Sequence, residues 1–211
     1  MLKKVGCLFI ALMLPVLAWA EGAEKFQEGV HYEALSFPVK TADASRVEVV
    51  EAFGYPCPHC NTFEPLVQRW EHSLAEDVTF SRLPVVFGRS WEPMARAYYS
   101  ADLLKVVDKT HQAMFNAVHI ERRRFSNKEQ VADFYGNLGV DKAKFSKMYN
   151  SFAVNMKLKQ GDSKVRGYGI TGVPSMVVNG KYRITAQMAG SPAKMLEVVD
   201  YLVAKERSLI N

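Results

Sequence analysis

The pattern of apolar side chains predicts a strand followed at once by a helix near residue 57. Residues 46–53 form a short run rich in β-branched and apolar side chains, which is typical of a buried strand. Residues 54–56 (Gly-Tyr-Pro) interrupt the run. The apolar positions after them recur at helical spacing, at Phe63, Leu66, Val67 and Trp70. Pro65 lies inside this helix, where a proline removes an amide donor and favours a kink.

The middle of the chain changes to a helical period. A second apolar run at residues 78–86 predicts another strand, and residues 88–165 then repeat apolar side chains every three or four positions. Ser126 and Glu129 match a capping box, and Asp141 matches an N-cap with a hydrophobic staple beside it. The helix that starts at Asp141 is expected to continue through Met148, Phe152 and Met156.

Strand character returns near the C-terminus. Residues 175–178 and 181–185 read as two strands of a hairpin, joined by a tight Asn179-Gly180 turn. Ser191-Pro192 then provides an N-cap and a proline at the first position of a final helix. The predicted fold is an α/β sheet protein with an inserted helical domain. We place the insertion at residues 88–165 and the sheet domain at residues 21–87 and 166–211.

The first twenty residues have the pattern of a cleaved secretory signal. Lys3 and Lys4 precede an apolar run at residues 5–17, and Ala18-Trp19-Ala20 offers small residues before a cleavage point at Glu21. The competing interpretation is an uncleaved membrane anchor. Cleavage removes two basic residues and no acidic one, so the net charge falls from +5 to +3. This mild surplus does not predict nucleic-acid binding, which needs a clustered basic face.

Cleavage also removes Cys7, so the mature chain keeps two of its three cysteines. Both lie in the motif Cys57-Pro58-His59-Cys60. A disulfide that closes so short a loop restricts the unfolded chain very little, so stabilisation is a poor reason for the pair. Redox chemistry is a better one.

The position of Cys57 at the predicted helix start favours its thiolate. Unpaired amides and the positive end of the helix dipole face the sulfur there, and a protonated His59 would add a positive charge. A stabilised thiolate makes the disulfide easier to reduce, which predicts an oxidase of other dithiols. Cys60, one turn further along, is the expected resolving thiol. We expect Cys57 to be exposed and Cys60 to be covered.

Three other interpretations of the motif are weaker. Half of a zinc site would need a second ligand pair, and His31, His72, His111 and His119 offer none at suitable spacing. Covalent haem attachment needs a histidine after the second cysteine, where this chain has Asn61. An inert buried pair remains open but fits the helix-start position poorly.

The whole pattern resembles the thioredoxin fold, and within it the DsbA family of bacterial periplasmic thiol:disulfide interchange proteins. The resemblance rests on the signal segment, the Cys-Pro-His-Cys motif after a strand, the helical block and Gly172-Val173-Pro174. It implies a monomeric periplasmic oxidase that donates the Cys57–Cys60 disulfide to newly secreted, unfolded proteins. It also implies no cofactor beyond this disulfide, no metal, and reoxidation by a quinone-linked inner-membrane oxidase of the DsbB type.

The resemblance also implies roles for residues outside the motif. Pro174 matches a cis-proline that faces the dithiol, and Val173 before it would bind substrate backbone. Glu51 matches a buried acid that relays protons to Cys60, and Glu64 matches an acid with a basic partner, here Arg82. The residues alone leave open a trans Pro174, a strand-edge Glu51 and an exposed Glu64.

Two other functions stay possible from the sequence. One is an isomerase or reductase with the same fold, although the chain has no residues left for a separate dimerisation segment. The other is a binding module or holdase that captures unfolded chains on its helical surface. The apolar side chains near Met114 and Phe115 fit a helix core better than a binding groove.

Overall fold

The structure, a computed structural model, describes residues 24–210. The predicted signal segment at residues 1–20 lies outside the described residues. The sheet contains the strands β1 (Glu33–Ala34), β2 (Val47–Phe53), β3 (Val78–Pro84), β4 (Ser175–Val178) and β5 (Tyr182–Thr185). The helices are α1 (Pro58–Glu71), α2 (Glu92–Leu103), α3 (Val107–His119), α4 (Lys128–Asn137), α5 (Lys142–Tyr149), α6 (Phe152–Gly167), α7 (Ala186–Ala189) and α8 (Pro192–Ile210).

The sheet has the order β1-β5-β4-β2-β3, so the two longest strands lie beside each other at one side. β2 and β3 are parallel, whereas β4 is antiparallel to both β2 and β5. A parallel pair needs a long crossover, and α1 provides it. The structure therefore confirms the α/β architecture and the helix between the first two predicted strands.

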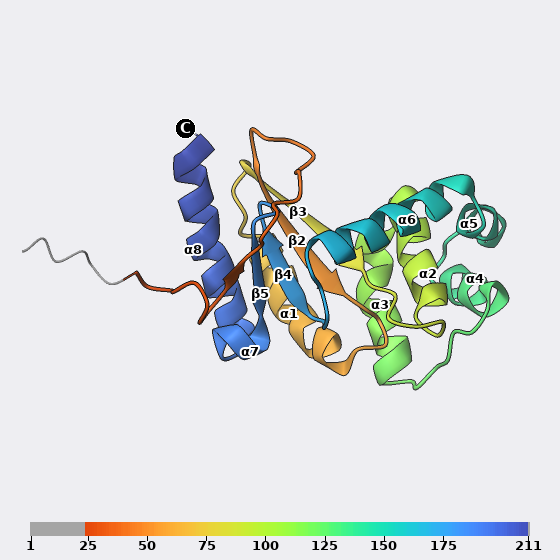
Figure 1. The fold of residues 1–211 in the computed structure, drawn as a ribbon. Helices are drawn as coiled ribbons and strands as arrows, with labels where there is room; N and C mark the ends of the chain where they lie inside the picture. The colour runs from red at the N-terminus through yellow and green to blue at the C-terminus, as the bar shows by residue number, and fades with distance from the viewer. Residues whose placement is uncertain (1–23, 211) are drawn as a thin grey trace, which may run out of the picture.

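Successive side chains of β2 point alternately to the two faces of the sheet and so pack against different elements. Val47 and Val49 pack with α1 and α8, whereas Val50 and Ala52 face the opposite side. Figure 1 shows α8 to the left of the sheet and the helical block, with α6, to its right. Because successive side chains of a strand point to opposite faces, Glu51 is on the same face as Val49, under α1.

The helices α2 to α6 follow β3 in the chain and return to β4 (Figure 1). The fold is thus an α/β sheet with an inserted helical block, as the sequence predicts. The boundaries at residues 87/88 and 165/166 stay a prediction, and α6 itself runs to Gly167. The core of this block also includes Phe53, Cys57 and Cys60, so it packs directly against the start of α1.

Two local predictions in the helical block are wrong. The helix expected to run from Asp141 through Met156 is broken into α5 and α6, because the Ser151 hydroxyl caps a new helix by accepting from the Val154 amide. The capping box is shifted by one residue: Asn127, not Ser126, is the N-cap and accepts from the Gln130 amide. The Asp141 cap is confirmed by its bond from the Lys144 amide.

The C-terminal hairpin and helix form as predicted. Asn179 and Gly180 both have positive φ, at 50° and 61°, which suits the two central positions of a tight hairpin turn. α8 begins at Pro192, and the Ser191 hydroxyl accepts from the Lys194 amide. The two-residue strand β1 and the short helix α7 had no signal in the apolar pattern.

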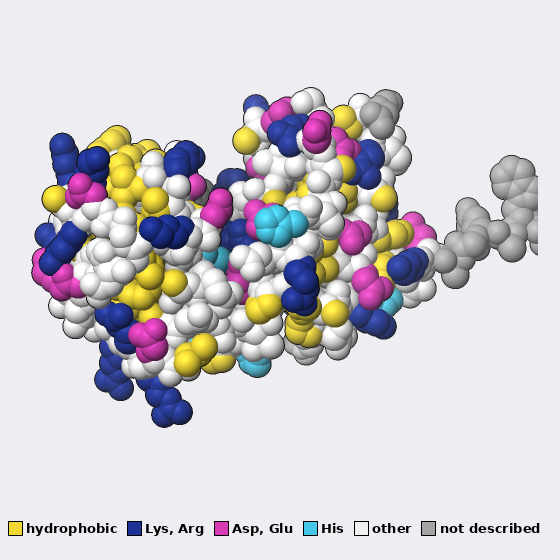
Figure 2. Space-filling view, turned by 180° about the vertical axis from the view of Figure 1, so that it is seen from behind, with side chains coloured by type: hydrophobic (Ala, Val, Ile, Leu, Met, Phe, Trp, Pro, Cys, Tyr) yellow, Lys and Arg dark blue, Asp and Glu magenta, His cyan; other side chains and the backbone are white. Residues whose placement is uncertain are grey.

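The surface mixes charges of both signs. On the face drawn in Figure 2, lysine and arginine side chains alternate with acidic ones and do not gather in one patch. Among residues 24–210, no helix combines the length and the apolar character needed to cross a bilayer.

Candidate active site at the Cys57–Cys60 dithiol

Cys57 is the N-cap of α1, as the sequence predicts. Its backbone is extended (φ −85°, ψ 117°), Pro58 opens the helix, and the sulfur accepts a hydrogen bond from the Cys60 amide at 3.4 Å. An N-cap side chain normally uses an oxygen to satisfy one of the free amides of the first turn. Here the acceptor is a sulfur, and those amides stabilise it best when it carries a negative charge.

The two thiols have opposite acidities. The hydrogen bond from the Cys60 side chain lowers the pKa of the Cys57 thiol to about 6 against the effect of burial, and the Cys60 and His59 amides and the His59 charge lower it further. The pKa of the Cys60 thiol is raised, by its hydrogen bond to Cys57 and by burial. At neutral pH the thiolate therefore belongs to Cys57.

The exposure of Cys57 differs from the prediction. Cys57 is 8% exposed and Cys60 is 0% exposed, so the expected order holds but Cys57 is itself nearly covered. The cover includes the backbone of Val173, whose carbonyl oxygen lies 3.4 Å from the Cys57 sulfur. The Val173 backbone thus covers one side of the Cys57 sulfur.

The segment before β4 completes this side of the site. The Val173–Pro174 peptide bond is cis, which confirms that prediction. A cavity of about 490 Å³ opens beside it. Its lining includes His59, Thr62, Gly172, Val173, Pro174 and Gln187. The structure thus brings the exposed His59 and the Val173–Pro174 pair around one hollow next to the dithiol.

A cluster of buried charges lies beneath the dithiol. Glu51 and Glu64 are 1% and 2% exposed, so neither is the strand-edge or surface acid that the sequence left open. Parallel pairing places Arg82 of β3 opposite Glu51 of β2, on the same sheet face. Glu64 approaches from α1, where it shares a face with Cys60, Phe63 and Val67. The expected contact of Glu64 with Arg82 is present, at 3.1 Å.

Arg82 contacts three carboxylates. Besides Glu64, its guanidinium lies 3.3 Å from Glu51 and 2.9 Å from Glu71. Burial alone would lower the pKa of Arg82, but the three acids raise it, so Arg82 stays charged. Burial raises the pKa of Glu51 to about 8, although the Arg82 charge opposes this, and the charge of Glu64 adds to the increase. Glu51 therefore holds a proton at neutral pH.

Sequence reasoning missed His111 and Tyr55. His111 lies on α3 with its Nε2 atom 3.2 Å from a Glu64 oxygen, and its Nδ1 atom is 2.7 Å from the Tyr55 hydroxyl. The signal was available, since His111 stands three and four residues before Met114 and Phe115 on the apolar stripe of its helix. A histidine on a buried stripe needs polar partners, and these are supplied here by distant elements.

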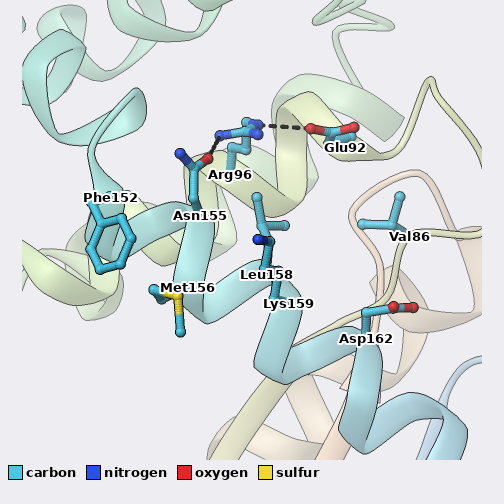
Figure 3. Close-up of a pocket in the computed structure, with 9 residues that line it drawn as sticks. All are labelled: Val86, Glu92, Arg96, Phe152, Asn155, Met156, Leu158, Lys159 and Asp162. Atoms are coloured by element: carbon cyan, nitrogen blue, oxygen red, sulfur yellow. Dashed lines mark hydrogen bonds and ion pairs between the residues drawn. The ribbon is translucent and has the colours of Figure 1, made fainter.

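A separate cavity of about 450 Å³ lies between α2, α6 and the segment after β3. Figure 3 shows Arg96 reaching Glu92 and Asn155 at its rim, with Phe152 at one side. None of the predicted site residues lines it, so it is distinct from the dithiol site. Within residues 24–210, no group of three or more potential ligands has the spacing of a metal site.

Comparison with known proteins gives the same family throughout. The model of the DSBA-like thioredoxin domain matches residues 75–202. The thiol:disulfide interchange protein DsbA of Pseudomonas aeruginosa is 40% identical over 196 residues, 93% of each chain. That of Burkholderia cepacia is 35% identical over 205 residues, 96% of each chain.

Solved structures agree. The crystal structure of Pseudomonas aeruginosa DsbA has a TM-score of 0.86 at 41% identity, covering 89% of this chain and 97% of that one. The oxidoreductase DsbA from Xylella fastidiosa has a TM-score of 0.79 at 35% identity, with 84% and 96% covered. Since sequence, fold and the dithiol at a helix start all agree, this chain belongs to the DsbA family and is a thioredoxin-fold protein disulfide oxidoreductase.

Proposed function

We propose that this protein oxidises cysteine pairs in newly secreted, unfolded periplasmic proteins by donating its Cys57–Cys60 disulfide. The observation that supports this direction most is the Cys57 sulfur at the start of α1, where its pKa is about 6. A stabilised thiolate favours the reduced form of the protein, so the disulfide accepts electrons readily from other thiols.

The reaction has two exchange steps. A substrate thiolate attacks the Cys57 sulfur, the Cys57–Cys60 bond breaks, and its electron pair leaves on Cys60, which takes up a proton. The second substrate thiolate then attacks the substrate sulfur of this mixed disulfide, and Cys57 leaves as a thiolate. Two electrons have moved from substrate to protein. Cys57 is the better leaving group of the two because its thiolate is the more stable.

His59 and Pro58 tune Cys57 in this proposal. The exposed His59 adds its amide and, when protonated, its charge to the stabilisation of the sulfur. Pro58 occupies the first helical position, where the missing amide hydrogen costs nothing. It leaves the amides of His59 and Cys60 as the donors nearest to the sulfur.

Glu51 is the proton relay for Cys60, and Glu64 holds the basic partner in place. Cys60 is fully buried, so the thiolate released there in the first step needs a proton from inside the protein. A protonated Glu51 can supply it and can take it back during reoxidation, because its pKa is about 8. Arg82 cannot do so, since an arginine does not lose its proton.

Val173 and Pro174 bind the substrate. The Val173 carbonyl lies against the Cys57 sulfur, and a hollow of about 490 Å³ adjoins it. Such a segment could pair with the Val173 backbone as an added strand does. This would align a substrate cysteine with Cys57 without demanding any particular sequence around it.

The protein works as a monomer in the periplasm after its signal segment is cleaved. Its clients are unfolded secreted proteins, and a quinone-linked inner-membrane oxidase of the DsbB type restores the disulfide. No nucleic acid and no metal takes part. These statements rest on family membership and on the signal pattern of residues 1–20.

The redox equilibrium with glutathione tests the direction. We expect a reduction potential well above the value of about −270 mV that is typical of thioredoxin. A potential at or below that value would identify the protein as a reductase instead. A Cys57→Ala variant should form no disulfides in a reduced, unfolded substrate, and full retained activity would point to a holdase. Cys60→Ala should accumulate mixed disulfides at Cys57 when its thiolate attacks a substrate that already carries a disulfide, with one substrate cysteine leaving as a thiolate, and mass spectrometry can locate them.

A further inference from the structure

His111 is a fully enclosed histidine at the junction of the helical block and the sheet. It is 4% exposed. Four aromatic rings surround it with centroids 5.1 to 5.8 Å away: Phe53, Tyr55, Tyr98 and Phe115. Buried polar groups need hydrogen-bond partners, so the protein groups around the two ring nitrogens decide how this imidazole is held.

Glu64 and Tyr55, which lie beside the two ring nitrogens of His111, determine which nitrogen carries the hydrogen. Burial lowers the pKa of His111 even though Glu64 opposes this, so the ring is neutral. A carboxylate only accepts hydrogen bonds, which assigns the ring hydrogen to Nε2, 3.2 Å from Glu64. Nδ1 then accepts from the Tyr55 hydroxyl at 2.7 Å. Nε2 and that Glu64 oxygen are in close contact, and neither has a hydrogen-bond partner among the described residues, so the only polar group close to each is the other.

The contact continues to the acid beneath Cys60. The other Glu64 oxygen lies 3.1 Å from Arg82 Nη2, and Arg82 Nε lies 3.3 Å from Glu51. The guanidinium is thus shared by Glu64, Glu51 and Glu71, the last of which lies 2.9 Å from Nη1. Whatever holds Glu64 in place also decides how closely Arg82 can approach Glu51.

We propose that His111, oriented by Tyr55, is a positioning residue that holds Glu64 against Arg82 and so keeps Arg82 from pairing fully with Glu51. The inference rests on the proposed role of Glu51 as proton relay. It gives the helical block, through α3, a direct part in the acid–base properties of the dithiol site.

The physical reason is a competition for one positive charge. The Arg82 charge lowers the pKa of Glu51, and the Glu64 charge raises it. Without the Nε2 hydrogen, Glu64 is free to rotate away and Arg82 can turn toward Glu51. The charged form of Glu51 is then stabilised and its pKa falls. The ionisable groups that face Glu51 or His111 are Tyr55, Cys60, Glu64, Glu71, Arg82 and Tyr98.

Two substitutions at position 111 separate positioning from packing. His111→Leu removes both nitrogens. His111→Gln keeps an amide group near the place of Nε2, which can still donate to Glu64. The first readout is the titration of the Glu51 carboxyl by ¹³C NMR of the reduced protein, assigned with Glu51→Gln. The second is the pH profile of the rate at which a thiol substrate reduces the disulfide.

We expect the apparent pKa of Glu51 to fall by about one pH unit in His111→Leu, because the contact that holds Glu64 against Arg82 is lost and the Arg82 charge moves toward Glu51. In His111→Gln the pKa of Glu51 should stay close to its value in the unmodified protein. An unchanged Glu51 titration in His111→Leu would overturn the inference, and so would equal shifts in the Leu and Gln variants. His72→Leu, at an exposed histidine near the end of α1, is the matched control and should change neither readout.

The two proposals can fail separately. If His111→Leu moves the Glu51 titration but Glu51→Gln leaves the rate profile unchanged, the relay role fails and the positioning role stands. If Glu51→Gln removes the ionisation from the rate profile and His111→Leu does not move it, only the His111 inference fails. Should His111→Leu not fold, His111→Asn replaces it, because its shorter amide reaches Tyr55 and not Glu64.

Discussion

Arg82 and Glu51 stand opposite each other in the parallel register of β3 and β2, and Arg82 Nε lies 3.3 Å from a Glu51 oxygen. The Arg82 and Glu51 side chains are only 9% and 1% exposed. Arg82 is therefore the positive charge around which the acids under the dithiol are arranged.

Loss of Arg82 should destabilise the protein severely. Arg82→Met leaves Glu51 and Glu64 buried without their cation, and breaking a buried pair from one side costs about 3–5 kcal/mol. Urea denaturation at pH 8 measures the loss. It should be smaller at pH 5, where Glu51 is protonated, since its pKa is raised to about 8. Adding Glu64→Gln to Arg82→Met should recover part of the stability. A loss below about 1 kcal/mol at pH 8 would show that Arg82 contributes no more to stability than an exposed ion pair does.

The stability of the reduced protein should depend on pH through Cys57. The folded pKa of this thiol, about 6, is below its ordinary value of 9.0. A group whose pKa is lower in the folded than in the unfolded protein stabilises the fold. This stabilisation is complete above the pKa of the unfolded protein and is lost as the pH falls to the pKa of the folded protein. The free energy of unfolding of the reduced protein, minus that of the oxidised protein, should therefore increase from pH 6 to pH 9. The slope is at most about 1.4 kcal/mol per pH unit, since one proton is involved.

Parallel denaturation series of the two redox forms check this dependence. The oxidised protein is the internal control, because its Cys57 cannot ionise. A difference that stays flat between pH 6 and pH 9 would contradict a stabilised thiolate at Cys57.

Removal of the His59 side chain should raise the pKa of Cys57 only modestly. His59 is exposed, and its charge is a smaller influence on Cys57 than the hydrogen bond from Cys60 and the backbone amides. Exposed charge pairs contribute about 1 kcal/mol or less, which corresponds to less than about one pH unit. Ultraviolet absorbance of the thiolate in His59→Ala measures the shift. A variant with an unchanged pKa would refute the tuning role of this side chain.

Gly180→Ala should disrupt the hairpin between β4 and β5. Gly180 has φ of 61°, and a Cβ there would overlap the Val39 carbonyl oxygen. We expect a loss of about 2 kcal/mol or more, since both the backbone conformation and the contact oppose a side chain. Gly190→Ala is the control, because Gly190 shares a positive φ but has no atom near its added Cβ. Thermal unfolding should show the larger loss at Gly180.

Local patterns in the sequence predict most of the elements of this fold. The run at residues 46–53, the caps at Asp141 and Ser191 and the Asn179-Gly180 turn depend on neighbouring residues alone, and all of them form. The errors are local too. Ser151 can cap a helix or sit within one, and the apolar period around it does not distinguish these two cases.

The sequence by itself determined the dithiol and its place at a strand-to-helix junction, because four adjacent residues and the period around them carry that information. Only the tertiary structure decided what surrounds it. The Val173 carbonyl reaches Cys57 across 116 positions, and His111 meets Tyr55 across 56. Those contacts depend on the register of β2 with β3 and β4 and on the packing of α3 against α1. No residue pattern near any one of these side chains specifies that packing, since it follows from how all of the apolar faces are buried together.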